Sequence, residues 1–129
     1  MSVSFPSDHL FFLQLTADTF TDTVMSIKEN EGLLRVGSKT ISLIALPGSV
    51  RLQHAFWDKF KTRARAIIFV LDSVSYMSDA HNVADLLYDY LSDSHITRNR
   101  IPFLIVCNKQ DQTRAKSSQV IATQLEKEM

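Results

Sequence analysis

Residues 66–73 read AIIFVLDS, an unbroken apolar run that stops at Asp72 and Ser73. Such a run lacks the alternation of a half-buried strand and is typical of a strand covered on both faces, as in parallel sheets. A second run, IPFLIVC, spans residues 101–107, and apolar residues at helical spacing lie between the two runs, from Val83 to Leu91. This strand, helix, strand order predicts a parallel sheet with right-handed crossovers.

A hairpin is predicted before the first buried strand. Residues 33–36 and 40–46 carry the apolar and β-branched side chains of strands, and Gly37-Ser38 between them is a typical turn. The Pro47-Gly48 pair then ends the second of these strands. The predicted fold is therefore α/β, with a mostly parallel sheet and one antiparallel hairpin strand.

Three further helices are predicted from the spacing of apolar side chains: residues 9–15 after the capping residues Ser7 and Asp8, residues 52–65, and residues 117–128. The last of them is expected to turn three apolar side chains inward: Val120, Ile121 and Leu125. In the helix over 52–65, Trp57 is expected in the core, with a partner contact as the alternative. The basic residues of this segment are interpreted as a solvated face, with proximity to a membrane as the alternative: Lys59, Lys61, Arg63 and Arg65.

Composition and charge place the chain among globular proteins and limit its partners. The 129 residues suit one domain, and 14 basic against 14 acidic residues give a formal net charge of zero. A neutral surface has no general attraction for nucleic acid or anionic lipid, so we expect no direct nucleic-acid partner. The apolar runs are much shorter than the about 20 residues that cross a bilayer, so this chain alone is expected to be soluble.

The remaining reactive side chains show no pattern of a site. The single cysteine, Cys107, cannot form an internal disulfide and lies in an apolar run, which suits a reducing compartment. The histidines lack metal-ligand spacing and are interpreted as surface residues: His9, His54, His81 and His95. The sequence therefore predicts neither a catalytic residue nor a metal site.

A polar motif directly follows the second buried strand. Asn108, Lys109 and Asp111 stand in the order Asn-Lys-Gln-Asp, which matches the Asn-Lys-X-Asp guanine-specificity motif of GTP-binding proteins. A carboxylate can accept hydrogen bonds from guanine N1–H and its exocyclic amine, whereas adenine offers neither donor at these positions. The lysine stem can lie along the base, and the asparagine amide can bond neighbouring backbone. The alternative interpretation is an ordinary polar turn between a strand and a helix.

Read in order, five segments resemble the beta subunit of the signal recognition particle receptor, a Ras-like and Arf-like GTPase family. They are LPG (46–48), KFKTRARAIIFVLDS (59–73), VADLLYDYLSDS (83–94), FLIVCNKQD (103–111) and AKSSQVIATQLEKEM (115–129). The resemblance implies a P-loop NTPase three-layer sandwich that binds GTP or GDP. It also implies a location at the cytosolic face of the endoplasmic reticulum membrane, with attachment through a segment outside this chain. The partner that it implies is the receptor alpha subunit.

The phosphate-binding parts of such a domain depart from the family pattern. Ala45 replaces the acid of the Asp-X-X-Gly turn, which leaves Gly48 as a weak phosphate contact. Residues 5–9 read FPSDH where a P-loop needs glycines and a lysine, and the acid there would repel phosphate. Residues 32–40, GLLRVGSKT, resemble a P-loop with an inserted serine, but a strand rather than a helix is predicted to follow.

Two catalytic parts also differ from those of a working GTPase. Ser49 stands after the Pro-Gly turn, where a glutamine or histidine would orient water. The loop position for a magnesium-binding threonine falls near Met25, with only Thr23 or Ser26 nearby as substitutes. We therefore expect no catalysis by this chain, little support for Mg²⁺, and weak or lost nucleotide binding.

The sequence is interpreted as one partial GTPase-like domain over residues 1–129, beginning at a degenerate P-loop and ending before a last strand and helix. The leading functional hypothesis is a scaffold for the receptor alpha subunit that acts in membrane targeting of nascent secretory proteins. The alternatives are a shortened form of an active GTPase that binds and hydrolyses GTP, and an Arf-like relative with a different partner.

Overall fold

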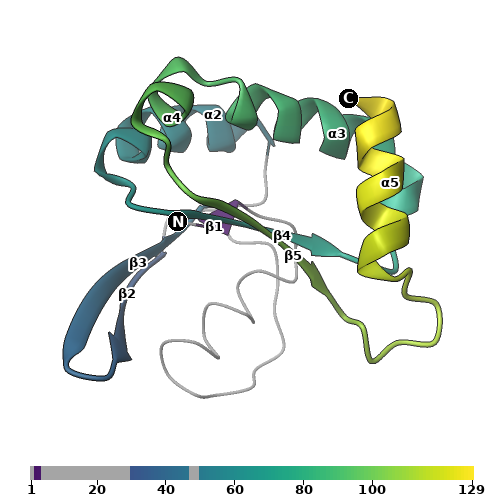
Figure 1. The fold of residues 1–129 in the computed structure, drawn as a ribbon, viewed down its shortest axis with the longest axis horizontal. Coiled ribbons are helices and arrows are strands. Elements are labelled where there is room, and N and C mark those ends of the chain that lie inside the picture. Colours follow the sequence, from purple (N-terminus) through teal and green to yellow (C-terminus); the bar gives the residue numbers. More distant parts are fainter. Residues whose placement is uncertain (1, 4–29, 47–49) are drawn as a thin grey trace.

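The computed structural model describes residues 2–3, 30–46 and 50–129, arranged as helices above a twisted sheet (Figure 1). The sheet is five-stranded with the order β2-β3-β1-β4-β5. Its strands are β1 (Ser2–Val3), β2 (Asn30–Val36), β3 (Lys39–Ala45), β4 (Ile67–Asp72) and β5 (Phe103–Asn108). The helices are α2 (Val50–Phe60), α3 (Ala80–Leu91), α4 (Ser94–Asn99) and α5 (Ser118–Glu128), with short 3-10 turns η1 (Lys61–Arg63) and η2 (Tyr76–Asp79).

The predicted mostly parallel sheet with one antiparallel hairpin strand is confirmed. β2 pairs with β3 in antiparallel orientation, whereas β1 is parallel to both β3 and β4, and β4 is parallel to β5. The run that predicted a fully covered strand forms β4, in which Ile67, Phe69 and Val70 have no exposed surface. Successive side chains of a strand point to opposite faces, so β4 is buried on both sides.

The hairpin turns where the sequence predicted. Val36 pairs with Lys39, and Gly37 between them has a φ of 61°, a left-handed conformation that glycine adopts without steric cost. Residues 32–40 therefore lie in two strands and their turn. The P-loop-like string in this segment is not followed by a helix, as expected, and cannot present a helix N-terminus to a phosphate.

The centre of the sheet differs from the prediction that the sequence begins at a degenerate P-loop, after the first strand. Ser2 pairs with Ala45 of β3 and with Ile68 of β4, and Val3 pairs with Phe69. A central strand position is thus filled by residues 2–3, although the sequence was interpreted as beginning after that strand. The predicted helix over residues 9–15 and the loop around Met25 lie outside the described residues.

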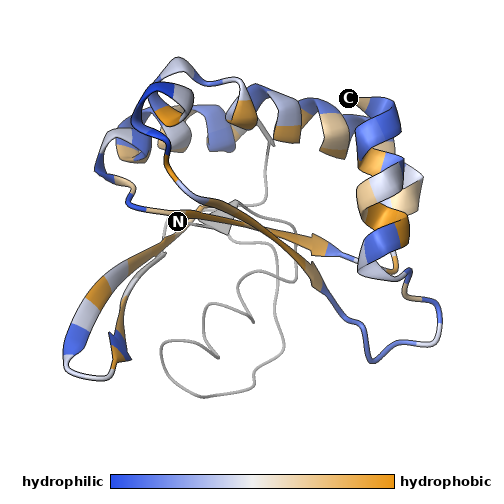
Figure 2. Ribbon diagram, viewed as in Figure 1, coloured by the Kyte–Doolittle hydropathy of each residue, from blue (hydrophilic) through white to orange (hydrophobic). Residues whose placement is uncertain are grey.

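The main core lies between the sheet and the helices. Phe69 of β4, Phe60 of α2 and Tyr90 of α3 are among its largest fully buried side chains. α5 contributes Ile121 and Leu125, which are 0% and 2% exposed. Figure 2 shows the same arrangement, with apolar residues along β4 and β5 and hydrophilic residues in the loop that follows β5. Each such side chain contributes about 1.5–3 kcal/mol through burial.

Three details of the predicted elements are wrong. The helix predicted to reach Arg65 ends as α2 at Phe60 and continues only as η1, because Ala64 is extended. Val120 is 52% exposed, so α5 turns only Ile121 and Leu125 inward. The strand predicted as buried over 101–107 forms β5, in which Leu104 and Ile105 are 57% and 39% exposed, since β5 pairs with β4 on one side only within the described sheet.

Asp93, which the sequence did not single out, joins α2 to the start of α4. Its Oδ2 accepts hydrogen bonds from the Trp57 indole and the Lys61 ammonium, both at 3.0 Å, and its Oδ1 accepts from the His95 amide at 2.8 Å. Trp57 is 4% exposed, as predicted for a core residue. Lys61 is not part of a fully solvated basic face, because its side chain is only 24% exposed and pairs with Asp93.

Asp93→Asn is expected to lower the free energy of unfolding at neutral pH. It should also make this free energy depend less on pH in acid. Burial opposes ionisation of Asp93, but the Trp57 and Lys61 hydrogen bonds outweigh it and lower its pKa from 3.8 to about 2. A depressed folded-state pKa contributes stability above pH 3.8 that is lost as pH falls through about 2, and the shift corresponds to about 2 kcal/mol. Urea unfolding of both proteins between pH 2 and 5 measures this difference; parallel curves would contradict it.

Candidate functional site

The polar residues that end β4 and β5 lie next to each other in the sheet. The two strands are parallel and in register from Ile67 with Phe103 to Asp72 with Asn108. Ligands of open parallel sheets bind beyond this edge. The loops that leave it, residues 73–75 after β4 and 109–117 after β5, are therefore the place to look for binding chemistry.

The Asn108 side chain fixes the start of the loop after β5. Its Oδ1 accepts a hydrogen bond from the Lys109 amide at 2.8 Å, the backbone role that the sequence predicted for this amide. Its main-chain oxygen accepts from the Ser73 amide at 3.1 Å, which joins this loop to the end of β4. Lys109 has a φ of 61°, and a lysine in this left-handed region costs about 1–2 kcal/mol that surrounding contacts must offset.

An ion pair connects the two loops. The Lys109 ammonium lies 2.6 Å from Asp72 Oδ2, and the side chains are 43% and 12% exposed. The other carboxylate oxygen, Oδ1, accepts from the amides of Val74 at 2.8 Å and Ser75 at 3.4 Å. Burial opposes ionisation of Asp72, but the hydrogen bonds from Lys109 and Val74 outweigh it and lower its pKa.

A second bridge runs beside the ion pair. Gln110 Nε2 donates to Ser73 Oγ at 2.7 Å and to the Lys116 main-chain oxygen at 2.8 Å. The Lys116 amide donates to the Ser73 main-chain oxygen at 3.0 Å. Ser73 has no exposed surface, so this bridge holds the far end of the loop against the end of β4.

Asp111 stands at the outer side of this loop. It is exposed, and its Oδ2 accepts a hydrogen bond from the neighbouring Gln112 side chain at 3.1 Å. A turn closes beneath it, because the Gln112 amide donates to the Lys109 main-chain oxygen at 3.1 Å. The loop therefore presents an accessible carboxylate, suited to a ligand with paired N–H donors, beside a lysine stem that is partly open to solvent.

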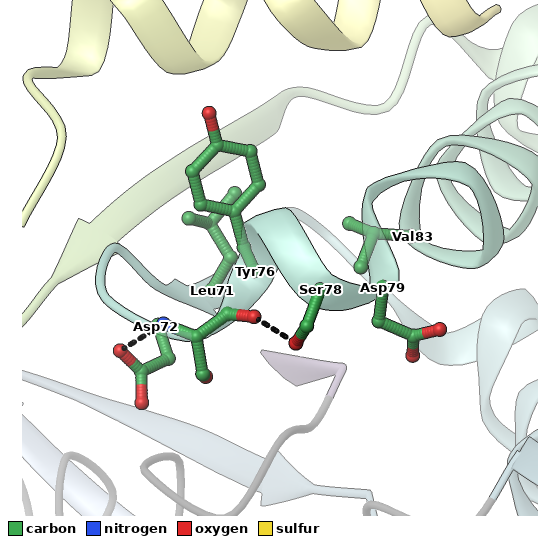
Figure 3. A pocket seen from close by; sticks show the side chains of 7 residues that line it. Leu71, Asp72, Tyr76, Ser78, Asp79 and Val83 are labelled. Atoms are coloured by element: carbon green, nitrogen blue, oxygen red, sulfur yellow. Dashed lines mark hydrogen bonds between the residues drawn. The ribbon is translucent and has the colours of Figure 1, made fainter.

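A pocket of about 200 Å³ lies next to Asp72, between the end of β4 and the start of α3. Figure 3 shows the side chains that surround it: Leu71, Asp72, Ser75, Tyr76, Ser78, Asp79 and Val83. Ser78 Oγ donates to the Ser75 main-chain oxygen at 2.7 Å, which holds the turn on one side of the pocket. Asp72 therefore both lines this pocket and pairs with the Lys109 ammonium.

Two acidic residues, Asp72 and Asp79, are among those that line the pocket, and each has a partner elsewhere, Lys109 for Asp72 and Asn82 for Asp79. In Figure 3 the Tyr76 hydroxyl points away from Ser78 and Asp79. Burial raises the pKa of Tyr76, and its hydroxyl has no hydrogen-bond partner among the described residues.

The predicted phosphate side is only partly within the described residues. Ala45 is buried at the end of β3, 4% exposed, so no carboxylate is available at this strand end. Gly48, Ser49 and residues 5–9 lie outside the described residues. Within residues 2–3, 30–46 and 50–129, no three acidic, histidine or cysteine side chains gather as metal ligands. In the same ranges no helix has the length and hydropathy to cross a bilayer.

The motif residues are adjacent in sequence, whereas the residues that hold the motif in place are distant from it. Asn108, Lys109 and Asp111 do lie together at the predicted edge. Asp72 and Ser73 follow Leu71 at a strand end where a ligand is expected, but neither of them had a predicted role. Gln110, the variable position of the motif, carries no signal in sequence because its role depends on Ser73 being opposite.

Comparisons with known proteins identify a family for most of the chain. A family model described as the signal recognition particle receptor beta subunit matches residues 7–129. The chain is 40% identical over 123 residues to the signal recognition particle receptor subunit beta of Rattus norvegicus, covering 93% of this chain and 46% of the relative. The chain thus spans about half the length of this relative.

Solved structures show the same fold. The structure of the mammalian SRP receptor matches with a TM-score of 0.89 and 36% identity, covering 98% of this chain and 69% of that one. The Arl6 BBS3 small GTPase from Trypanosoma brucei, solved with bound GppNp, matches with a TM-score of 0.80 and 21% identity, covering 97% and 73%. The second likeness supports the P-loop GTPase fold predicted from the sequence. With the family match over most of its length, the chain belongs to the signal recognition particle receptor beta subunit family.

Proposed function

We propose that this chain is a guanine-recognising scaffold of the receptor beta type whose phosphate-binding machinery is degenerate. It acts in membrane targeting of nascent secretory proteins, by contact with the receptor alpha subunit at the cytosolic face of the endoplasmic reticulum membrane. The guanine base is bound through Asn108, Lys109 and Asp111, and the phosphates of GTP or GDP add little affinity. Gly48 is the one weak phosphate contact in this proposal.

The observation that carries base recognition is the ordered loop after β5. Asn108 Oδ1 bonds the Lys109 amide, and the Lys109 ammonium is held by Asp72, while Asp111 remains exposed. An ordinary polar turn has no need of an ion pair to the neighbouring strand end. The accessible carboxylate can accept from both guanine donors, and a site left with an unpaired acceptor rejects adenine.

The residues on the phosphate side lack the charges and glycines that hold a nucleotide phosphate. Ala45 supplies no carboxylate for a magnesium-bound water. Asp8 in the segment 5–9, together with the absence of glycine and lysine there, opposes a phosphate cradle. Without phosphate contacts, binding depends on a few hydrogen bonds to the base, and we expect a dissociation constant of about 0.1–1 mM.

The test is a nucleotide titration of the purified chain by ¹⁵N NMR, with and without Mg²⁺. GTP, GDP and guanosine are expected to shift the amides of residues 108–112 with dissociation constants within about threefold of each other, because the phosphates contribute little. ATP is the matched control and should leave these amides unshifted. Tight, magnesium-dependent GTP binding would instead support a working GTPase, and no guanine selectivity would overturn base recognition.

The scaffold part needs a separate experiment with the receptor alpha subunit. The chain and the alpha subunit are mixed with no nucleotide, with GTP or with ATP, and complex formation is measured by size-exclusion chromatography. We expect a complex of equal stability in all three conditions, since a scaffold that lacks the phosphate sensor has no means to report GTP. A complex that forms only with GTP, or none at all, contradicts the scaffold hypothesis.

A further inference from the structure

Asp72 joins the end of β4 to the loop after β5 (residues 109–117), called the guanine-type loop below, yet it is not part of the Asn-Lys-X-Asp motif. It is 9% exposed and pairs with Asn108 across the two strand ends. The end of β4 and the loop after β5 are joined by several hydrogen bonds. The contact of Asp72 with Lys109, at 2.6 Å, joins opposite charges. This position makes Asp72 a candidate to control how Lys109 is presented.

The two carboxylate oxygens of Asp72 have different partners. Oδ1 holds the turn after β4 through the amides of Val74 and Ser75, whereas Oδ2 holds the Lys109 ammonium. A buried carboxylate needs such partners, because leaving one oxygen unpaired costs about 1–3 kcal/mol. Both loops are thus fixed through one side chain.

The position of Lys109 requires an outside restraint. Its φ of 61° is a left-handed conformation that a lysine avoids in a free loop. Its side chain is 43% exposed although the ammonium is paired, so the methylene stem is the part that remains open. A stem fixed at its far end and open along its length can receive the face of a base without first losing rotamer freedom.

We propose that Asp72 is a positioning residue for guanine recognition: it holds the Lys109 ammonium, so the lysine stem and the loop are arranged before a nucleotide arrives. The identity of the ligand as a guanine nucleotide depends on the proposed function above. The claim that Asp72 orders the loop does not depend on it. The bridge from Ser73 through Gln110 to Lys116 supports the other side of the loop. Asp72 therefore acts through Lys109 and does not touch the base itself.

Asp72→Asn separates the two tasks of the carboxylate. An asparagine keeps an oxygen that can accept from Val74 and Ser75, but its amide group cannot hold an ammonium. Lys109→Met removes the ammonium and keeps the apolar stem. We expect each single variant to weaken GDP binding about tenfold, and the double variant to weaken it no more than either single variant, because both remove the same contact. Losses that multiply to about a hundredfold would overturn the proposal.

Asp93→Asn is the matched control for these affinities. It makes the same change at another ion-paired carboxylate, the N-cap of α4, which contacts Trp57 and Lys61. It is expected to lower stability without altering the GDP dissociation constant. A purely structural role of Asp72 would make the two Asp→Asn variants alike, and equal GDP affinities in them would overturn the proposal.

Hydrogen exchange without nucleotide gives a second measurement that separates this proposal from the function it rests on. The amides of Gln112, Ala115 and Lys116 bond to main-chain oxygens within the loop and on Ser73. In Asp72→Asn and in Lys109→Met these amides should exchange at least about tenfold faster, with the Ile121 amide unchanged. Unchanged exchange in Lys109→Met overturns the proposal even if Asp72→Asn fails to fold. If the unmodified chain binds no GDP, the proposed function fails, and the exchange rates alone decide whether Asp72 orders the loop.

Discussion

Phe69→Ala is expected to lower the free energy of unfolding by about 3–5 kcal/mol, the usual cost of removing a buried aromatic side chain. Phe69 has no exposed surface, and its ring centroid lies 6.3 Å from that of Phe103 on the neighbouring strand. β4 is buried on both faces, so the surrounding side chains cannot close the cavity easily. Since a domain of this size is stable by only about 5–15 kcal/mol, urea unfolding should show a large shift of the midpoint.

Leu104→Ala provides the matched control on the adjacent strand. Leu104 is also a large apolar residue of the sheet, but it is 57% exposed and so loses little packing when shortened. Its effect should stay within about 0.5 kcal/mol, the usual range for surface substitutions. Equal losses for the two variants would show that the buried side of the sheet does not dominate stability, contrary to the structure.

Asp111→Asn is expected to weaken GDP binding by about 10–100-fold and to reverse the preference between GDP and xanthosine diphosphate. Guanine presents N–H donors at N1 and at its exocyclic amine, and an asparagine can accept only one of them while its own amide group faces the other. Leaving one such donor unpaired costs about 1–3 kcal/mol. Xanthine has a carbonyl in place of the exocyclic amine, so the new amide group gains an acceptor. Competition between the two nucleotides measures the reversal.

Asp89→Asn is the control for this specificity change. Asp89 is an exposed carboxylate on α3, outside the site, so its replacement changes net charge by the same amount without touching the loop. Its nucleotide preference should remain that of the unmodified chain. If Asp111→Asn keeps the same preference for GDP, then the loop after β5 is a polar turn and the motif match carries no binding role.

The order of elements could be predicted from sequence because each element carries its own periodicity. The continuous apolar run became β4, and the side chains of Val83, Leu87 and Tyr90 became the buried face of α3, each 1% exposed. α4 was missed because its six residues are too few to show a period; it is set by the Asp93 cap and by Ile96, which is 4% exposed. Short elements of this kind depend on tertiary packing more than on propensity.

Burial was harder to predict than element type. Val120 and Ile121 are adjacent apolar residues of α5, yet one is 52% exposed and the other has no exposed surface. β5 shows the same limit, because its run of apolar residues predicted a covered strand while Leu104 faces solvent. Apolar composition states what a side chain tolerates, whereas the neighbouring elements decide which surface is covered.

Some features of the guanine-type loop could be predicted from sequence, and others depend on the tertiary structure. By themselves, the residues determined the α/β class, the hairpin, the two parallel strands and the motif of Asn108, Lys109 and Asp111, because all of these are patterns of neighbouring positions. Only the tertiary structure placed Asp72 beside Lys109 and Ser73 beside Gln110, each 37 positions apart. Contacts between distant positions follow from strand register, which is decided when whole faces pack together rather than by any local run of residues.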